Sequence, residues 1–564
     1  MTGGAHDTVN TVNRRGLAAD LGIAAAIVVV VTIVVGVTAQ SLGFTRDEGY
    51  YFKAAELYAH WFRTLVSQPT TALSAAGINA DLAYNPEHPF LLKGLFSLAR
   101  TIQQATGLDV MGHNALRFPA WVVAGLSVAL VYALGRAAKL ARSTSLVAAL
   151  VFFSLPHVFW HMHVACFDVG VTAAHAGLVA AWLRFRHSLR GTIVVGLVFG
   201  LCAATKHNVL PVPALFVLHW ALGEAGNPQG VVDGRRLRLP LGFVTLALIA
   251  PIVYVALWPY LWPDVVGRFG AYVGFHLRHE HYPIMLFGEL LTAPPFPWSF
   301  PLVMWALTIP VPVLVVLTGG VVLATGVVLA FLWRRFMGAG SAREDTVVPL
   351  GDVARSPSGS TALLLLLNAA MPVFLIALPS SPIFGGTKHW MNALPFVCVL
   401  GAWALHEAVA RLRRHSIVVV AVVGVFVAMP GFVQSARVWP YGLGAYNELA
   451  GFSRGAANLG LQRTFWGYEI REALPLINER VPRGGRLHGG DVNQDSHRRY
   501  LDDGLLRSDI AFSAGVRGAD AAHVEPLGEF KQQQLDVWNE WQRHNPDVVV
   551  DVEGVPLSTV TFRR

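Results

Sequence analysis

Two acidic residues follow the first long apolar run of the sequence almost at once. The run ends near Ala39, and Asp47 and Glu48 come within the next ten residues. An ionised carboxylate can take a proton from a hydroxyl or an amine and make that group a better nucleophile. Charge at the end of a membrane span is costly unless it is paired, hydrated or used, so both acids are candidate catalytic residues. Alternatively, they cap a helix that starts here, because acids favour helix N-termini.

Basic and imidazole side chains gather at the ends of other apolar runs. Such groups can stabilise the negative charge that develops on a phosphate leaving group. The alternatives are that Lys206 and Lys388 anchor in lipid headgroups and that Asp168 caps the helix that follows it. The ionisable residues at these ends are Glu87, His88, Lys93, Arg117, His157, His161, His163, Asp168, Lys206, His207, His276, His279, Glu280, His281, Lys388 and His389.

The histidine spacing also admits a divalent metal ion. His276, His279 and His281 could bind one together with Glu87 or an aspartate. The i, i+4 pair formed by His157 and His161 could present two ligands on one helix face. The alternative is that these imidazoles only form hydrogen bonds at the membrane interface.

The composition indicates a membrane protein rather than a soluble enzyme. Hydrophobic residues make up 54% of the 564 residues and charged residues 14%, against roughly 25% charged residues in ordinary globular chains. The mean hydropathy is +0.48. The net charge of +8 does not require a nucleic-acid partner, because lysine and arginine concentrate in the cytoplasmic loops of membrane proteins. The three cysteines form neither a disulfide framework nor a zinc motif.

Eleven apolar runs are candidates for membrane-spanning helices. The first is too long for the core of a signal peptide, so we expect a retained helix with a cytoplasmic N-terminus. The run at 303–333 exceeds one straight span, and Pro310 and Pro312 predict a short interfacial piece before the spanning part. The runs are 17–39, 116–135, 144–162, 168–185, 190–206, 208–223, 239–259, 303–333, 361–380, 391–410 and 416–434.

The basic clusters fit one orientation of these helices. Counted from a cytoplasmic N-terminus, every compact basic cluster falls in a cytoplasmic loop, as the positive-inside rule requires. The ionisable residues named above then all face the opposite side, where we expect them to form one active site. The clusters are Arg136-Lys139-Arg142, Arg184-Arg186-Arg190, Arg235-Arg236-Arg238, Arg334-Arg335 and Arg411-Arg413-Arg414.

Three long segments are then external, at 41–115, 260–302 and 435–564. We expect helices near 47–66, 87–104, 467–479 and 525–543 and a strand over 547–552, the first helix lying in the membrane interface. The sequence therefore predicts an α-helical polytopic domain over 1–434, with external loops at 41–115 and 260–302. A small external α/β domain follows over 435–564.

A site of this kind suits sugar transfer from a lipid-linked phosphate. A carboxylate would activate the acceptor, and cations or a metal ion would stabilise the leaving phosphate. A single displacement inverts the anomeric carbon without a second, nucleophilic carboxylate. A transporter or lipid flippase is the main alternative, but such proteins place charge near the bilayer midplane and often contain inverted repeats, which this sequence lacks. A non-catalytic scaffold is disfavoured because acids and bases lie on one face.

Several short motifs occur in a recognisable order along the chain. They are Arg46-Asp47-Glu48-Gly49-Tyr50-Tyr51, Glu87-His88-Pro89, Arg117-Phe118-Pro119, Asp168 after an aromatic-rich helix end, Gly196 to Lys206, and Lys388-His389-Trp390 near Pro395. Over about residues 15–410 they resemble integral-membrane glycosyltransferases of the GT-C type. The resemblance is to the group that holds the protein O-mannosyltransferases and the bacterial aminoarabinose lipid A transferases (glycosyltransferase family 39 and its relatives).

The resemblance implies a GT-C fold, a polyprenyl-phosphate sugar as donor and a catalytic aspartate in the first external loop, here Asp47. It implies a helper acid, matched by Asp168, with Glu48 as a further acidic candidate. The candidate donor-binding residues are Arg117, Lys206, Lys388, His389 and His88, and the candidate metal ligands are Glu87 and His276.

Two departures from the group bear on the substrates. The chain has His88-Pro89-Phe90 where lipid A transferases tend to have Lys-Pro-Pro, and it lacks the β-trefoil insertion of eukaryotic protein mannosyltransferases. The expected acceptor is a glycan, lipid or protein of the cell envelope. We expect the protein in the plasma (inner) membrane, with its active site and C-terminal domain outside.

Overall fold

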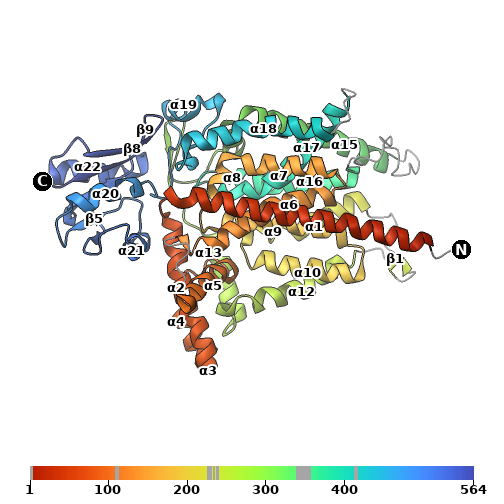
Figure 1. The fold of residues 1–564 in the computed structure, drawn as a ribbon, viewed down its shortest axis with the longest axis horizontal. Helices are drawn as coiled ribbons and strands as arrows, with labels where there is room; N and C mark the ends of the chain where they lie inside the picture. Colours follow the sequence, from red (N-terminus) through yellow and green to blue (C-terminus); the bar gives the residue numbers. More distant parts are fainter. Residues whose placement is uncertain are drawn as a thin grey trace.

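The computed structural model describes residues 4–107, 114–224, 231–232, 235–236, 240–337, 357–411 and 417–564. Figure 1 shows a bundle of long helices with the N-terminus at one end and a sheet-containing region at the other. The bundle consists of α1 (Gly4–Thr38), α6 (Phe118–Ala137), α7 (Arg142–Ser154), α8 (Pro156–His161), α9 (Phe167–Phe185), α10 (Leu189–Ala203), α11 (Val212–His219), α12 (Gly242–Ala256), α14 (Phe300–Thr308), α15 (Val311–Phe336), α16 (Gly359–Ala377), α17 (Leu394–Arg411) and α18 (Ile417–Val438).

The predicted polytopic helical architecture is confirmed. Among the described residues, six helices are long and apolar enough to cross a membrane, and α7, α10 and α12 are shorter apolar helices. Each of the eleven predicted runs coincides with one helix or with two consecutive ones. The long run at 303–333 is divided into α14 and α15, as expected, because Pro310 is the N-cap residue of α15 and cannot continue a helix. Part of the basic clusters at 235–238 and 411–414 lies outside the described residues.

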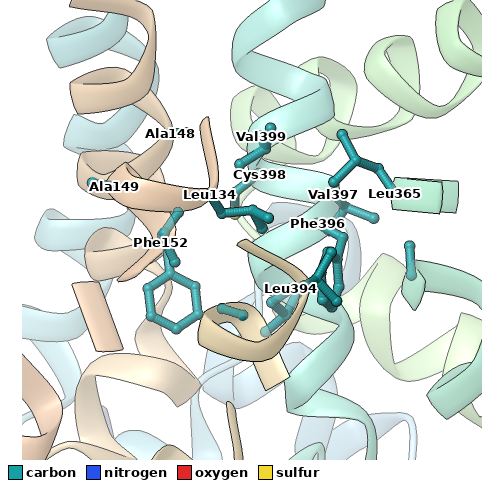
Figure 2. Packing of buried hydrophobic residues seen from close by; sticks show 14 of the residues in the cluster. Leu134, Ala148, Ala149, Phe152, Leu365, Leu394, Phe396, Val397, Cys398 and Val399 are labelled. Atoms are coloured by element: carbon teal, nitrogen blue, oxygen red, sulfur yellow. The ribbon is translucent and has the colours of Figure 1, made fainter. Parts of the chain in front are cut away.

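The bundle core is built from apolar side chains that face inward from several helices. Figure 2 shows part of it, where side chains of α6, α7, α16 and α17 meet. Because lipid tails are themselves apolar, close packing rather than the hydrophobic effect holds such helices together. The labelled residues include Leu134, Phe152, Leu365, Phe396 and Cys398.

A second group of helices covers the end of the bundle that faces away from the N-terminus. It consists of α2 (Arg46–Ser67), α3 (Pro69–Ala72), α4 (Ala75–Leu82), α5 (Phe90–Thr106) and α13 (Val265–Leu277). In Figure 1, α2 runs across the direction of α1 rather than along it, as expected for a helix in the membrane interface. The helices predicted near 47–66 and 87–104 are therefore present as α2 and α5.

The polar C-terminal part forms a mixed five-stranded sheet in the order β6-β5-β7-β9-β8. β5 (Arg486–His488) is parallel to β6 (Ala511–Ser513) and β7 (Ala521–Val524), whereas β9 (Val555–Phe562) is antiparallel to β7 and β8 (Val548–Val552). Its helices are α19 (Phe452–Asn458), α20 (Ile470–Arg480), α21 (Gln494–Asp502) and α22 (Lys531–Trp541). The predicted small α/β region is confirmed, with α20, α22 and β8 at the expected places. Two short hairpins complete the described strands, β1 (Val231–Val232) with β2 (Arg235–Arg236) and β3 (Ile284–Leu286) with β4 (Glu289–Leu291).

Candidate active site

Asp47 forms an ion pair with Lys388, which lies 341 residues further along the chain. Asp47 is in the first turn of α2, and Lys388 opens the short helical turn that leads into α17. Nζ of Lys388 lies 3.3 Å from Oδ2 of Asp47 and 4.3 Å from the centre of the Trp466 ring. The Asp47 side chain keeps 19% of its surface exposed, so a substrate can reach its carboxylate.

A second ion pair joins Asp168 to Lys206. Asp168 is in the first turn of α9, Lys206 follows α10, and Nζ of the lysine lies 2.8 Å from Oδ1 of the aspartate. Both side chains are buried. The α9 N-terminus has no side-chain cap, and the Asp168 carboxylate turns to Lys206 instead. The charge of Lys388 also acts on Asp168, so the two ion pairs belong to one electrostatic cluster.

His88 lies beside this cluster in the loop between α4 and α5. Its Nε2 is 3.2 Å from the Tyr51 hydroxyl, and its ring stacks on Phe167 with the centres 4.6 Å apart. Burial, with the nearby charges of Lys206 and Lys93, holds the pKa of His88 well below its ordinary value. The imidazole is therefore neutral near pH 7. Nδ1 has no partner among the described residues. When the Tyr51 hydroxyl donates to Nε2, the ring proton is on Nδ1, which can then donate to a ligand oxygen.

His389 also contributes an unused imidazole nitrogen to this region. It follows Lys388 directly, and its ring meets the edge of Phe384 with the centres 4.8 Å apart. Its Nε2 is buried and has no hydrogen-bond partner in the described part of the chain. Lys206, Lys388, His88 and His389 thus supply two cations and two imidazoles that suit the oxygens of a phosphate.

The structure corrects the predicted roles of Glu48 and Arg117, because the two residues satisfy each other. Both side chains are 0% exposed. Nε and Nη2 of Arg117 each donate to a Glu48 oxygen at 2.7 Å, and Arg117 also donates to the carbonyls of Leu42 and Gly43. Glu48 accepts from two backbone N–H groups as well. Arg117 has no surface to offer a donor phosphate, and Glu48 has none to offer an acceptor.

Glu48 caps the N-terminus of α2, which was the alternative to a catalytic role. Thr45 is the N-cap of α2, its hydroxyl accepts from the Glu48 N–H, and the Glu48 carboxylate accepts from the Thr45 N–H. This reciprocal arrangement is a capping box. The Thr45-x-x-Glu48 spacing is typical of a capping box, so the sequence itself distinguishes Glu48, as a capping residue, from Asp47.

The residues predicted to bind a metal ion do not fit one. Nε2 of His276 is 3.0 Å from the backbone carbonyl of Glu87, a contact in which this nitrogen is a donor rather than a ligand. The Glu87 carboxylate accepts from the Asn85 amide, and the His276 ring lies tilted against the His207 ring with the centres 3.8 Å apart. Over the described ranges, no three His, Cys, Asp or Glu side chains form a group that could hold a metal ion.

The other histidines considered as metal ligands, His157 and His161, form hydrogen bonds within the protein instead. His157 uses both ring nitrogens, towards the Thr387 hydroxyl and the Ala445 carbonyl, each at 3.0 Å. His161 contacts the His157 carbonyl through Nδ1. The i, i+4 pair therefore links α8 to neighbouring segments rather than presenting two ligands.

Two residues near Asp47 were not predicted from the sequence as parts of the site. Trp466 lies under the Lys388 ammonium, and Asp491 is 2.6 Å from the guanidinium of Arg46, the neighbour of Asp47. Both come from the C-terminal part, and Asp491 is 445 residues away from Arg46 in the sequence. A local sequence pattern cannot predict a contact between residues that lie so far apart in the sequence.

The chain has a GT-C fold, in which a bundle of apolar helices carries charged groups at one end and a small sheet-containing domain follows. It is similar to the apo structure of ArnT from Cupriavidus metallidurans, with a TM-score of 0.51 and 13% identity over 96% of this chain and 98% of that one. ArnT of the same organism bound to undecaprenyl phosphate aligns with a TM-score of 0.45 and 13% identity, over 95% and 97%. The apo oligosaccharyltransferase of Archaeoglobus fulgidus aligns with a TM-score of 0.47 and 13% identity, over 88% of this chain and 64% of that one. No protein-family model and no curated protein sequence matches the chain.

Proposed function

We propose that the protein is an inverting glycosyltransferase that moves a sugar from a polyprenyl-phosphate donor to an acceptor of the cell envelope. One observation carries the proposal: the partly exposed Asp47 carboxylate lies at the end of the helical bundle that faces away from the N-terminus, paired with Lys388 and near the buried Asp168–Lys206 ion pair. The ArnT structure with undecaprenyl phosphate supports a lipid-phosphate donor for this fold. The acceptor is a glycan, lipid or protein, and the protein acts on the outer face of the plasma membrane.

The proposed reaction is a single displacement. The Asp47 carboxylate takes the proton of an acceptor hydroxyl as the hydroxyl oxygen bonds to the anomeric carbon. The bond between that carbon and the phosphate oxygen breaks, and the polyprenyl phosphate leaves with the electron pair. Because one displacement inverts the anomeric carbon, no second nucleophilic carboxylate is needed.

The remaining residues of the site would stabilise the leaving phosphate. Lys388 and Lys206 supply positive charge, and the neutral His88 supplies a hydrogen-bond donor. The Asp168 carboxylate is already engaged by the Lys206 ammonium, so we assign it to holding Lys206 in place. No step is assigned to a metal ion, because Glu87 and His276 do not fit one.

A direct test uses the purified protein in detergent with a panel of polyprenyl-phosphate sugars. We expect release of polyprenyl phosphate and a glycosylated product by mass spectrometry, with the anomeric configuration inverted. Envelope glycans and lipid-linked sugars from a deletion strain identify the acceptor. Transport of a labelled solute into proteoliposomes without any covalent product would overturn the proposal in favour of a transporter.

Replacement of Lys388 by Met is expected to lower kcat/KM for the donor by ~100-fold, because one preorganised charge at a developing anion is removed. The Asp47 carboxylate remains partly hydrated in this variant, so the fold is expected to survive. Lys53→Met is the matched control, since Lys53 lies on the same helix as Asp47 and has no ion pair among the described residues. Equal activities of the two variants would exclude Lys388 from the donor site.

A further inference from the structure

The C-terminal part of the chain holds the segment that carries Asp47. The Asn493 amide donates to the Arg46 carbonyl at 2.9 Å, and the Ser496 hydroxyl donates to the Thr45 carbonyl at 2.9 Å. The Arg46 N–H donates in turn to the Trp466 carbonyl at 3.0 Å. The backbone groups on either side of the α2 N-terminus are therefore bonded to α21 and to the loop before α20.

An ion pair adds to this contact directly beside the proposed base. Asp491 lies 2.6 Å from Nη1 of Arg46, whereas the shortest distance from Arg46 to the Asp47 carboxylate is 3.9 Å. Arg46 therefore pairs more closely with Asp491 than with Asp47, and this pairing draws the guanidinium towards the C-terminal part.

The fit between the two parts leaves no room for a side chain at two glycines. A Cβ atom on Gly43 would lie 2.0 Å from the Tyr468 carbonyl oxygen, and a Cβ atom on Gly49 would lie 2.3 Å from Oγ of Ser496. Tyr500 bonds both the N–H and the carbonyl of Phe44 through its hydroxyl. The segment thus contacts the C-terminal part at Gly43, Phe44, Thr45, Arg46 and Gly49.

The apolar side chains of both parts also form one core. The buried cluster around Phe44 and Tyr51 continues into the sheet through Leu487 and Val560. A shared core of this kind does not allow the C-terminal part to move freely as a tethered module, because such motion would expose apolar surface.

We propose that the C-terminal domain is a positioning element for the proposed base Asp47, with Asp491 and Asn493 as its positioning residues. This inference rests on the proposed function, because it concerns the same carboxylate. Asp491 acts by retaining Arg46, and Asn493 acts by fixing the carbonyl one residue before Asp47. A displacement of a catalytic group by about 1 Å can cost ~100-fold in rate.

The test compares kinetics of three full-length variants with those of the unaltered protein. Asp491→Asn removes the charge that holds Arg46. Asn493→Asp keeps the side-chain oxygen that caps α21 through the Ser496 N–H but loses the donor to the Arg46 carbonyl. We expect each to lower kcat by ~10- to 100-fold while KM for the donor changes by less than about twofold, because the donor phosphate groups are untouched. Asp491→Glu is expected to restore part of kcat.

Asp509→Asn is the matched control, since Asp509 is also paired with an arginine in the same domain but lies on its surface. It is expected to keep full kcat. If Asp491→Asn fails to fold, Asn493→Asp alone decides the outcome. Wild-type kcat in Asn493→Asp and in any folded Asp491→Asn protein would overturn the positioning role. An active Asp47→Asn protein would instead overturn the proposed function, so the two failures are distinguishable.

Discussion

Replacement of Asp47 by Asn is expected to lower sugar transfer by at least ~100-fold, because a general base contributes about 10²- to 10⁴-fold and an amide cannot take a proton. The substitution preserves the shape of the side chain, and Lys388 keeps its contact with the Trp466 ring. Folding and donor binding should therefore be unchanged. The measurement is initial transfer rate at saturating donor, with thermal unfolding in the same detergent.

Asp81→Asn is the control for this substitution. Asp81 is a buried aspartate in the same group of helices as Asp47, and its partner is His60 of α2 rather than a residue of the site. We expect this variant to transfer sugar at nearly the normal rate. Full activity of Asp47→Asn would show that another group takes the proton, and the proposed mechanism would have to be abandoned.

Replacement of Glu48 by Gln is expected to destabilise the protein by about 3–5 kcal/mol, the usual cost of leaving one partner of a buried ion pair uncompensated. Arg117 would remain buried with its charge, bonded only to neutral oxygens. The α2 N-terminus would also lose part of its capping box. The measurement is thermal unfolding of the detergent-solubilised protein, and loss of activity should follow loss of folded protein.

Glu56→Gln provides the comparison on the same helix. The Glu56 side chain is 30% exposed, and its partner Arg499 also pairs with Asp503. Such a pair is worth about 0–1 kcal/mol, so little change in thermal unfolding is expected. A Glu48→Gln protein that unfolds normally but transfers no sugar would return Glu48 to the catalytic residues.

The helical architecture could be predicted because hydropathy and charge are local properties of the sequence. Each spanning run is apolar over a length that the bilayer fixes, and Pro310 marks the break between α14 and α15 without reference to any distant residue. The external helices α2 and α5 were predictable for the same reason. Asp47 and Lys388 were expected on one face of the membrane, and the structure places them in contact.

The pairing of charges within the site could not be predicted, because it depends on contacts between distant segments. The same resemblance placed Glu48 beside Asp47 and Arg117 beside Lys388, yet Glu48 and Arg117 neutralise each other in the interior. The contact between Asp491 and Arg46 could not be predicted either, because the two residues lie far apart in the sequence. Residue type and position along the chain do not reveal whether a charged group is exposed to substrate or buried in an ion pair with a neighbouring residue.

Gly43 and Gly49 pack closely against the C-terminal part, and this limits which segments can be exchanged between proteins of this kind. A chimera joined only near residue 435 would bring a foreign surface against backbone atoms that have no spare space. Residues 43–49 would have to be exchanged together with the tail.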